Sequence, residues 1–210
     1  MSDSIVDYYF TVTSPWSYLG HAPFLALAKA HGFEVAYKPV DFGKVFAGSG
    51  GLPLPQRAVQ RRRYRMFELQ RWRDYRKTEL NLRPKHFPTD PGPGARLIAA
   101  ASAAGHDVGA LTGAIMRAAW AEERNVADPA TLVDIADGLG LDGTALRAAA
   151  ESPEGLARAD ALTREAIDAQ VFGAPTYVVR GEPFWGQDRL ELVERAMKGV
   201  AGPYAVEEPY

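Results

Sequence analysis

Strand-like sequence is concentrated at the two ends of the chain, and this division constrains the fold more than any other feature. Near the amino terminus, Ile5–Phe10 and Phe33–Val40 are rich in β-branched and aromatic residues and flank a helix-like run, Pro15–Ala30. Near the carboxyl terminus, Thr176–Val179 and Pro183–Trp185 surround a glycine turn and predict a hairpin. The β-α-β opening implies two parallel strands joined by a right-handed crossover.

The stretch between these ends has helical patterning. Helices are predicted at Arg57–Lys77, Ala95–Ala104, Val108–Glu123, Pro129–Leu139, Thr144–Ala150 and Glu154–Gln170, with a closing helix at Arg189–Lys198. Loops are expected where glycine and proline gather, at Gly43–Pro55 and Asn81–Pro93. This order predicts an α/β thioredoxin-like fold (β-α-β … α-β-β-α) interrupted by an all-helical insertion. We expect residues 1–45 and 165–210 to form the thioredoxin-like domain and residues 46–164 to form the insertion.

Composition narrows the functional classes. The chain has 210 residues, of which 47% are hydrophobic and 24% charged, as in a globular protein with a real core. Its net charge of -2 does not favour a nucleic-acid partner, and no apolar run reaches the roughly 18 residues of a membrane span. The first residues lack the basic and apolar segments of a signal peptide. We therefore expect a soluble cytoplasmic protein.

The sequence contains no cysteine, which excludes a protein disulfide, a thiolate nucleophile and a cysteine-ligated metal. The histidines are scattered without metal-ligand spacing, at His21, His31, His86 and His106. We expect them to be surface or capping residues, and we expect no metal site. A dithiol oxidoreductase is excluded for the same lack of cysteine.

Four motifs give the chain a resemblance to a known family. SPWSYLG follows the first strand, FGAPTYVV precedes the hairpin, FWGQDRLELVERA leads into the last helix, and RYRMFELQRWRDY lies in the first inserted helix. The first three of these motifs, in this order, resemble the 2-hydroxychromene-2-carboxylate isomerases, which are related to the kappa-class glutathione transferases within the thioredoxin-like superfamily. The fourth resembles the first inserted helix of that family. The resemblance covers nearly the whole chain. It implies glutathione as the cofactor and a homodimer as the assembly.

Ser14 is the candidate catalytic residue. It precedes Pro15 at a predicted helix start, where unpaired N–H groups and the helix dipole favour negative charge. A hydroxyl in this position can donate a hydrogen bond to a thiolate, and the resemblance implies that the thiolate is the glutathione sulfur. The simpler alternative is that Ser14 is only the helix N-cap.

Two further segments are candidate glutathione-binding sites. The resemblance implies a cis proline at Pro175, which would leave the backbone of Ala174 free to pair with an extended peptide such as glutathione. It also implies that Gln187 and Asp188 bind the charged groups of the γ-glutamyl end. The alternatives are a trans proline that starts an edge strand and an aspartate that only caps the last helix.

The basic helix at Arg57–Lys77 has two interpretations. Its arginines form a solvated face, or a few of them face the cleft and bind carboxylates of the substrate or of glutathione; the sequence does not single out which ones. Members of the resembled family often carry a lysine and an asparagine near glutathione after the second strand. The corresponding stretch here, Val45–Gly51, has neither.

The resemblance implies a glutathione-dependent isomerase. Its reaction would interconvert 2-hydroxychromene-2-carboxylate and trans-o-hydroxybenzylidenepyruvate, or a similar aromatic hydroxy-carboxylate, by reversible thiolate addition. Two alternatives stay open. One is a kappa-like glutathione transferase, which releases the conjugate as its product. The other is a non-catalytic binding protein on a thioredoxin-like scaffold.

Overall fold

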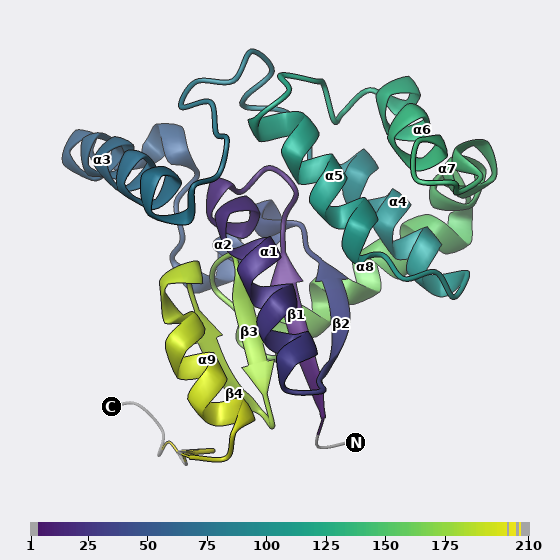
Figure 1. The fold of residues 1–210 in the computed structure, drawn as a ribbon. Coiled ribbons are helices and arrows are strands. Elements are labelled where there is room, and N and C mark those ends of the chain that lie inside the picture. Colours follow the sequence, from purple (N-terminus) through teal and green to yellow (C-terminus); the bar gives the residue numbers. More distant parts are fainter. Residues whose placement is uncertain (1–3, 201, 205, 207–210) are drawn as a thin grey trace.

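The computed structural model describes residues 4–200, 202–204 and 206, and it confirms the α/β thioredoxin-like fold. The strand order in the sheet is β2-β1-β3-β4 (Figure 1). The strands are β1 (Ile5–Phe10), β2 (Glu34–Pro39), β3 (Thr176–Val179) and β4 (Glu182–Trp185). Strand β1 runs parallel to β2 and antiparallel to β3, which forms the predicted hairpin with β4. The two ends of the chain therefore meet in one sheet.

Helices cover both faces of this sheet (Figure 1). They are α1 (Pro15–Ala30) and α9 (Leu190–Met197) on one face, and α2 (Phe42–Ser49) and α8 (Pro153–Asp168) on the other. Successive strand residues point to opposite faces. Tyr8 accordingly packs in the apolar cluster under α1 and α9, whereas Tyr9 packs in the cluster under α2 and α8.

The insertion between β2 and β3 is helical, as predicted. Its helices before α8 are α3 (Val59–Arg76), α4 (Gly92–Ala103), α5 (Gly109–Trp120), α6 (Pro129–Asp137) and α7 (Gly143–Glu151). Helix α5 packs on α1 and α4 contacts β2, so one apolar cluster continues from the sheet into the insertion. Helix α3 lies on the other side of α1 from α4–α7 (Figure 1). Within the described residues, no helix combines the length and apolar character needed to cross a membrane.

The prediction of a loop over Gly43–Pro55 was wrong, because α2 occupies most of it. Asp41 caps this helix by accepting a hydrogen bond from the Gly43 N–H at 2.9 Å, and Gly50 ends it in the left-handed conformation (φ 70°). Phe42 and Val45, one turn apart, are buried against the sheet. Burial of this apolar face outweighs the low helix propensity of the glycines.

Candidate functional site

Ser14 lies where β1 ends and α1 begins. Its N–H donates to the Thr11 carbonyl at 3.0 Å, and its Oγ accepts from the Ser17 N–H at 3.2 Å, so it is the N-cap of α1. The cap uses a lone pair of the oxygen and leaves the hydroxyl proton for an acceptor. Capping is therefore compatible with hydrogen bonding to an anion at the same helix end. Only 9% of Ser14 is exposed, so bulk solvent competes weakly for that bond.

The peptide bond between Ala174 and Pro175 is cis, as the resemblance implies, and the trans alternative is wrong. Strands β1 and β3 are antiparallel, with Tyr9 opposite Thr176. Continuing this register by two residues puts Ala174 opposite Thr11, at the turn that leads into α1. The cis-proline segment and the start of α1 therefore lie at the same edge of the sheet.

Gln187 lies on the turn that follows β4. The N–H of Gly186 donates to the Pro175 carbonyl at 2.9 Å, which fixes this turn to the cis-proline segment. Gln187 itself is 2% exposed. It packs closely against α1, because a Cβ atom added to Gly20 of that helix would lie only 2.6 Å from the Gln187 Cβ. The structure thus brings three of the predicted segments, around Ser14, Pro175 and Gln187, to one end of α1.

Asp188 differs from Gln187 because it is exposed to solvent. Its carboxylate pairs with Arg189 Nη1 at 2.6 Å. Neither the short 3-10 turn at Gln187–Arg189 nor α9 has a side-chain cap, so the alternative in which Asp188 only caps the last helix is wrong. Helix α9 begins at Leu190 rather than at the predicted Arg189, because Arg189 belongs to the 3-10 turn. Asp188 remains a surface carboxylate beside the buried Gln187.

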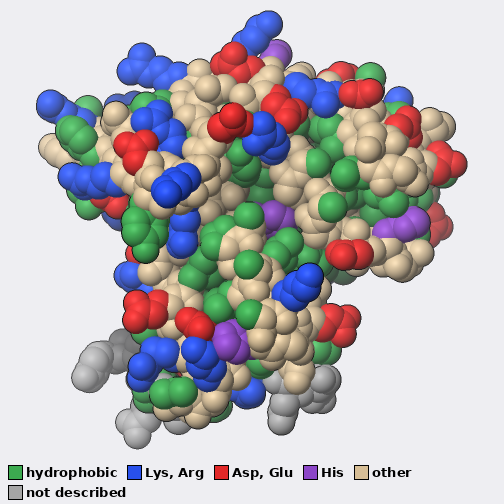
Figure 2. Space-filling model, in the orientation of Figure 1, with side chains coloured by type: hydrophobic (Ala, Val, Ile, Leu, Met, Phe, Trp, Pro, Cys, Tyr) green, Lys and Arg blue, Asp and Glu red, His purple; other side chains and the backbone are tan. Residues whose placement is uncertain are grey.

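Arg76 is a residue of this site that the sequence did not single out. From the last turn of α3, its Nε and Nη2 donate to Gln187 Oε1 at 3.3 and 3.1 Å, and Nη2 also donates to the Gln187 carbonyl at 3.2 Å. Figure 2 shows Lys and Arg side chains spread over the surface of α3. Because α3 carries many arginines, only the fold could distinguish the one that reaches Gln187.

A small hollow lies at Thr13, the residue before Ser14. Its lining includes Thr13, the neighbour of Ser14, and two aromatic side chains, Phe87 and Trp120, whose ring centroids are 5.0 Å apart. Trp120 is only 1% exposed and Ser14 is not part of the lining, so the hollow is a shallow depression near the start of α1.

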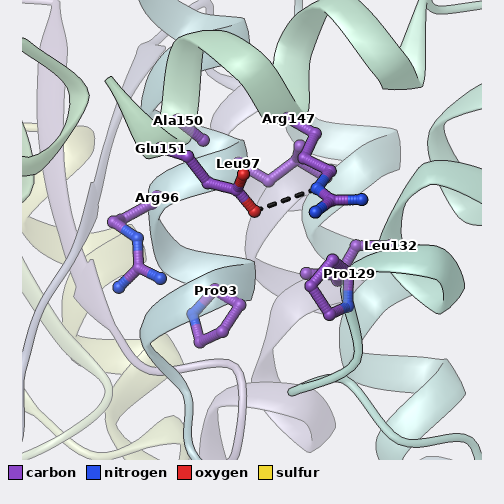
Figure 3. A pocket seen from close by; sticks show the side chains of 8 residues that line it. All are labelled: Pro93, Arg96, Leu97, Pro129, Leu132, Arg147, Ala150 and Glu151. Atoms are coloured by element: carbon purple, nitrogen blue, oxygen red, sulfur yellow. Dashed lines mark hydrogen bonds and ion pairs between the residues drawn. The ribbon is translucent and has the colours of Figure 1, made fainter.

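A second hollow lies within the insertion, between α4, α6 and α7 (Figure 3). Pro93, Leu97 and Leu132 form part of its lining, and on its α7 side the Arg147 Nε donates to Glu151 Oε1 at 2.9 Å, one helical turn further on. None of the predicted site residues lines this hollow. We therefore assign the candidate site to the edge of the sheet at Ser14.

The buried polar groups near α1 stay uncharged. His21, expected at the surface, is 5% exposed, because α5 packs over it and its Nε2 lies 2.9 Å from the Gly109 carbonyl. Burial lowers the pKa of His21 and raises those of Tyr8 and Tyr177 well above the ordinary tyrosine value. No group of three or more potential metal ligands occurs in the described part of the chain.

Comparisons with known proteins find relatives that match nearly the whole chain. Residues 5–198 match the family described as DSBA-like thioredoxin domain. The chain is 32% identical to a 2-hydroxychromene-2-carboxylate isomerase of Sphingobium xenophagum, and the match covers 90% of this chain and 95% of the relative. It is 30% identical to another such isomerase from Pseudomonas sp. (strain C18), and that match covers 93% of this chain and 91% of the relative. A solved 2-hydroxychromene-2-carboxylate isomerase superposes with a TM-score of 0.74 at 28% identity, covering 93% of this chain and 95% of that one. A probable DsbA oxidoreductase from Streptomyces coelicolor shares the fold, with a TM-score of 0.72 at 22% identity over 97% and 94% of the two chains.

Proposed function

Because the chain belongs to the DSBA-like thioredoxin family, and within it to the 2-hydroxychromene-2-carboxylate isomerases at about 30% identity, we propose that it is a glutathione-dependent isomerase. The proposed reaction interconverts 2-hydroxychromene-2-carboxylate and trans-o-hydroxybenzylidenepyruvate, or a similar aromatic hydroxy-carboxylate. The matches cover about nine-tenths of this chain and of each relative, which supports a shared activity and not only a shared domain.

The observation that carries the proposal is the free hydroxyl proton of Ser14 at the start of α1. A thiol has a pKa of about 8.5, so only a few per cent of it is thiolate at neutral pH. One charge-assisted hydrogen bond contributes roughly 1.5–3 kcal/mol, and about 1.4 kcal/mol moves a pKa by one unit. Ser14 together with the helix dipole is therefore sufficient to make a bound thiolate the main form at neutral pH.

The surrounding residues fit glutathione. The backbone of Ala174 lies just beyond the end of β1, where an extended peptide could add as a short strand. Because Arg76 occupies the Gln187 side-chain oxygen, the amide NH2 of Gln187 is left as a donor for a carboxylate. The exposed carboxylate of Asp188 suits an ammonium group. These groups match the two charges of the γ-glutamyl end.

Bound glutathione would supply a thiolate that adds reversibly to the conjugated enol-pyruvate unit, which turns a double bond into a rotatable single bond. Ser14 would hold the sulfur by donating its hydroxyl proton. Phe87, which lines the hollow at Thr13, would lie near the aromatic ring of the substrate. The protein thus positions two molecules and stabilises one negative charge.

The test is a near-ultraviolet titration of the glutathione thiolate with wild-type protein, Ser14→Ala and Ser14→Gly, together with turnover of 2-hydroxychromene-2-carboxylate. We expect the wild type to lower the thiol pKa by a unit or more, and both variants to lose this shift and most turnover. Glycine is a good N-cap without a hydroxyl, so Ser14→Gly separates the thiolate role from helix capping. Ser17→Ala, which removes a hydroxyl one turn further on, is the matched control.

Product mass decides between the proposed activity and its alternatives. An unchanged mass indicates isomerisation, whereas the added mass of the tripeptide indicates a glutathione transferase. Wild-type protein that binds no glutathione would support a non-catalytic binding protein. Near-wild-type turnover in both Ser14 variants would contradict the role proposed for Ser14.

A further inference from the structure

Arg57 and Arg65, called here the arginine pair, are partly buried cations on aromatic rings. The Arg57 guanidinium lies over Phe46, 5.9 Å from the ring centroid, and its Nε donates to the Leu52 carbonyl at 2.7 Å. The Arg65 guanidinium lies over Phe87 at 5.7 Å. Within the described residues, neither guanidinium has a carboxylate within ion-pair distance. Both charges are thus held against apolar surface without a counter-charge.

The acidic residues of α3 are occupied by other arginines. Glu68 pairs with Arg71 at 2.5 Å, and Asp74 pairs with Arg73 at 3.0 Å. Glu68 and Arg73 are half-buried and their partners Arg71 and Asp74 are exposed, so solvent partly screens these pairs. The exposed Arg61, Arg62 and Arg63 also lack a carboxylate partner among the described residues, but the arginine pair differs from them because its charges are partly buried.

Electrostatics favours an external anion at this place. Burial and, to a smaller extent, the positive charge of Arg57 together lower the pKa of Arg65 to about 10. Burial also lowers the pKa of Arg57. Both side chains remain protonated at neutral pH, so their partly desolvated charges stay uncompensated until an anion binds. A guanidinium group presents the planar donors that a carboxylate accepts, and the charge of Arg57 is near enough to act on Arg65.

The ring partners connect this pair to the candidate site. Phe46 belongs to α2, which follows β2, and it packs with Ala174 against the same apolar cluster. Phe87 lines the hollow that Thr13, the residue before Ser14, also lines. Because β1 and β2 are parallel, the segments that follow them lie at one edge of the sheet, where ligands of α/β folds bind.

We propose that Arg57 and Arg65 form a carboxylate-binding site for a molecule bound beside Ser14. This proposal rests on the proposed function for the identity of that molecule. The carboxylate belongs either to the glycine end of glutathione or to the aromatic acid that is isomerised. Both sources share the chemistry that the arginine pair recognises, a planar anion.

Calorimetric titration separates these sources without requiring turnover. The ligands are glutathione, its glycine ethyl ester, and cinnamate as an unreactive aromatic carboxylate. If the glycine carboxylate binds here, the wild type binds glutathione about tenfold or more tightly than the ester, and Arg65→Gln removes the difference. If the aromatic acid binds here, Arg65→Gln weakens cinnamate about tenfold and leaves both forms of glutathione unchanged.

Controls keep the result specific. Arg57→Gln should change the dissociation constants in the same direction as Arg65→Gln. Arg65→Lys should change them less, because it keeps the charge. Arg62→Gln alters an exposed residue of α3 and should leave them unchanged. Folding of each variant is checked by its unfolding temperature. Dissociation constants within twofold of wild type for all three ligands would overturn the proposal, as would no binding of any of them to the wild type. If glutathione or cinnamate binds tightly and Arg65→Gln weakens that binding, but no isomerisation occurs, the proposed function is overturned and the arginine pair is still a carboxylate-binding site.

Discussion

Arg76 and Gln187, 111 positions apart in the sequence, are joined by three hydrogen bonds between the end of α3 and the turn after β4. The Arg76 guanidinium also lies over the Trp72 ring, 5.2 Å from its centroid, which limits its movement. The contact ties the first helix of the insertion to a turn that is itself bonded to Pro175. Arg76 thus orients Gln187 from outside the thioredoxin-like part of the chain.

Arg76→Gln should weaken this turn and any ligand that it holds. The buried Gln187 oxygen would lose its charged donor, which typically costs about 1–3 kcal/mol. We expect a lower free energy of unfolding in urea and a raised dissociation constant for glutathione, with kcat at saturating glutathione changed much less. Arg73→Gln is the matched control, because the Arg73 guanidinium donates to the exposed Asp74 and not to Gln187. Equal effects of the two substitutions would contradict the positioning role.

Gly20→Ala should destabilise the protein although it replaces a glycine inside a helix. The new Cβ would lie 2.6 Å from the Gln187 Cβ and 2.8 Å from the Tyr177 hydroxyl, so α1 and the Gln187 turn would have to separate. Overpacking of this kind costs about 1–3 kcal/mol, which exceeds the gain of roughly 1 kcal/mol in helix propensity. Chemical denaturation measures the net change.

Gly48→Ala should stabilise the protein in the same denaturation experiment. Gly48 lies in α2 with no atom within 4 Å of its added Cβ, so only helix propensity and chain entropy change. We expect a gain of about 0.5–1 kcal/mol in the free energy of unfolding. If Gly20→Ala stabilised the protein as much as Gly48→Ala does, the close approach of α1 to Gln187 would be disproved.

Buried His21 should make the protein less stable in mild acid. Burial lowers its pKa in the folded state, whereas the unfolded chain has the ordinary value of about 6.5. Below pH 6.5 the unfolded state therefore binds more protons, and the free energy of unfolding falls as the pH drops toward the lowered pKa. Urea denaturation between pH 8 and pH 5 measures this slope.

His21→Gln isolates the contribution of this histidine. A glutamine amide can donate to the Gly109 carbonyl as the imidazole Nε2 does, but it does not titrate. We expect a shallower loss of stability on acidification in the variant than in the wild type. Parallel pH profiles for the two proteins would show that His21 does not cause the acid sensitivity.

Short-range signals in the sequence determined most of the fold. Ser14 and Pro15 mark the start of α1, and the apolar periodicities place strands at the ends and helices between them, because caps and periodicity act within a few residues. The motif around Pro175 indicated the cis bond by resemblance. The glycines around Gly48 concealed α2, because its formation depends on burial against a sheet that no local signal describes.

The tertiary structure alone decided which residues meet. The sequence presents Arg57, Arg65 and Arg76 as members of one basic run. In the fold, Arg76 reaches Gln187, while the other two lie over the rings of Phe46 and Phe87 without a carboxylate among the described residues. These pairings depend on how α3 docks across α1, which is set by side-chain packing between segments distant in sequence. The sequence by itself therefore determined the elements and their caps, and long-range packing decided the chemical environment of each charged side chain.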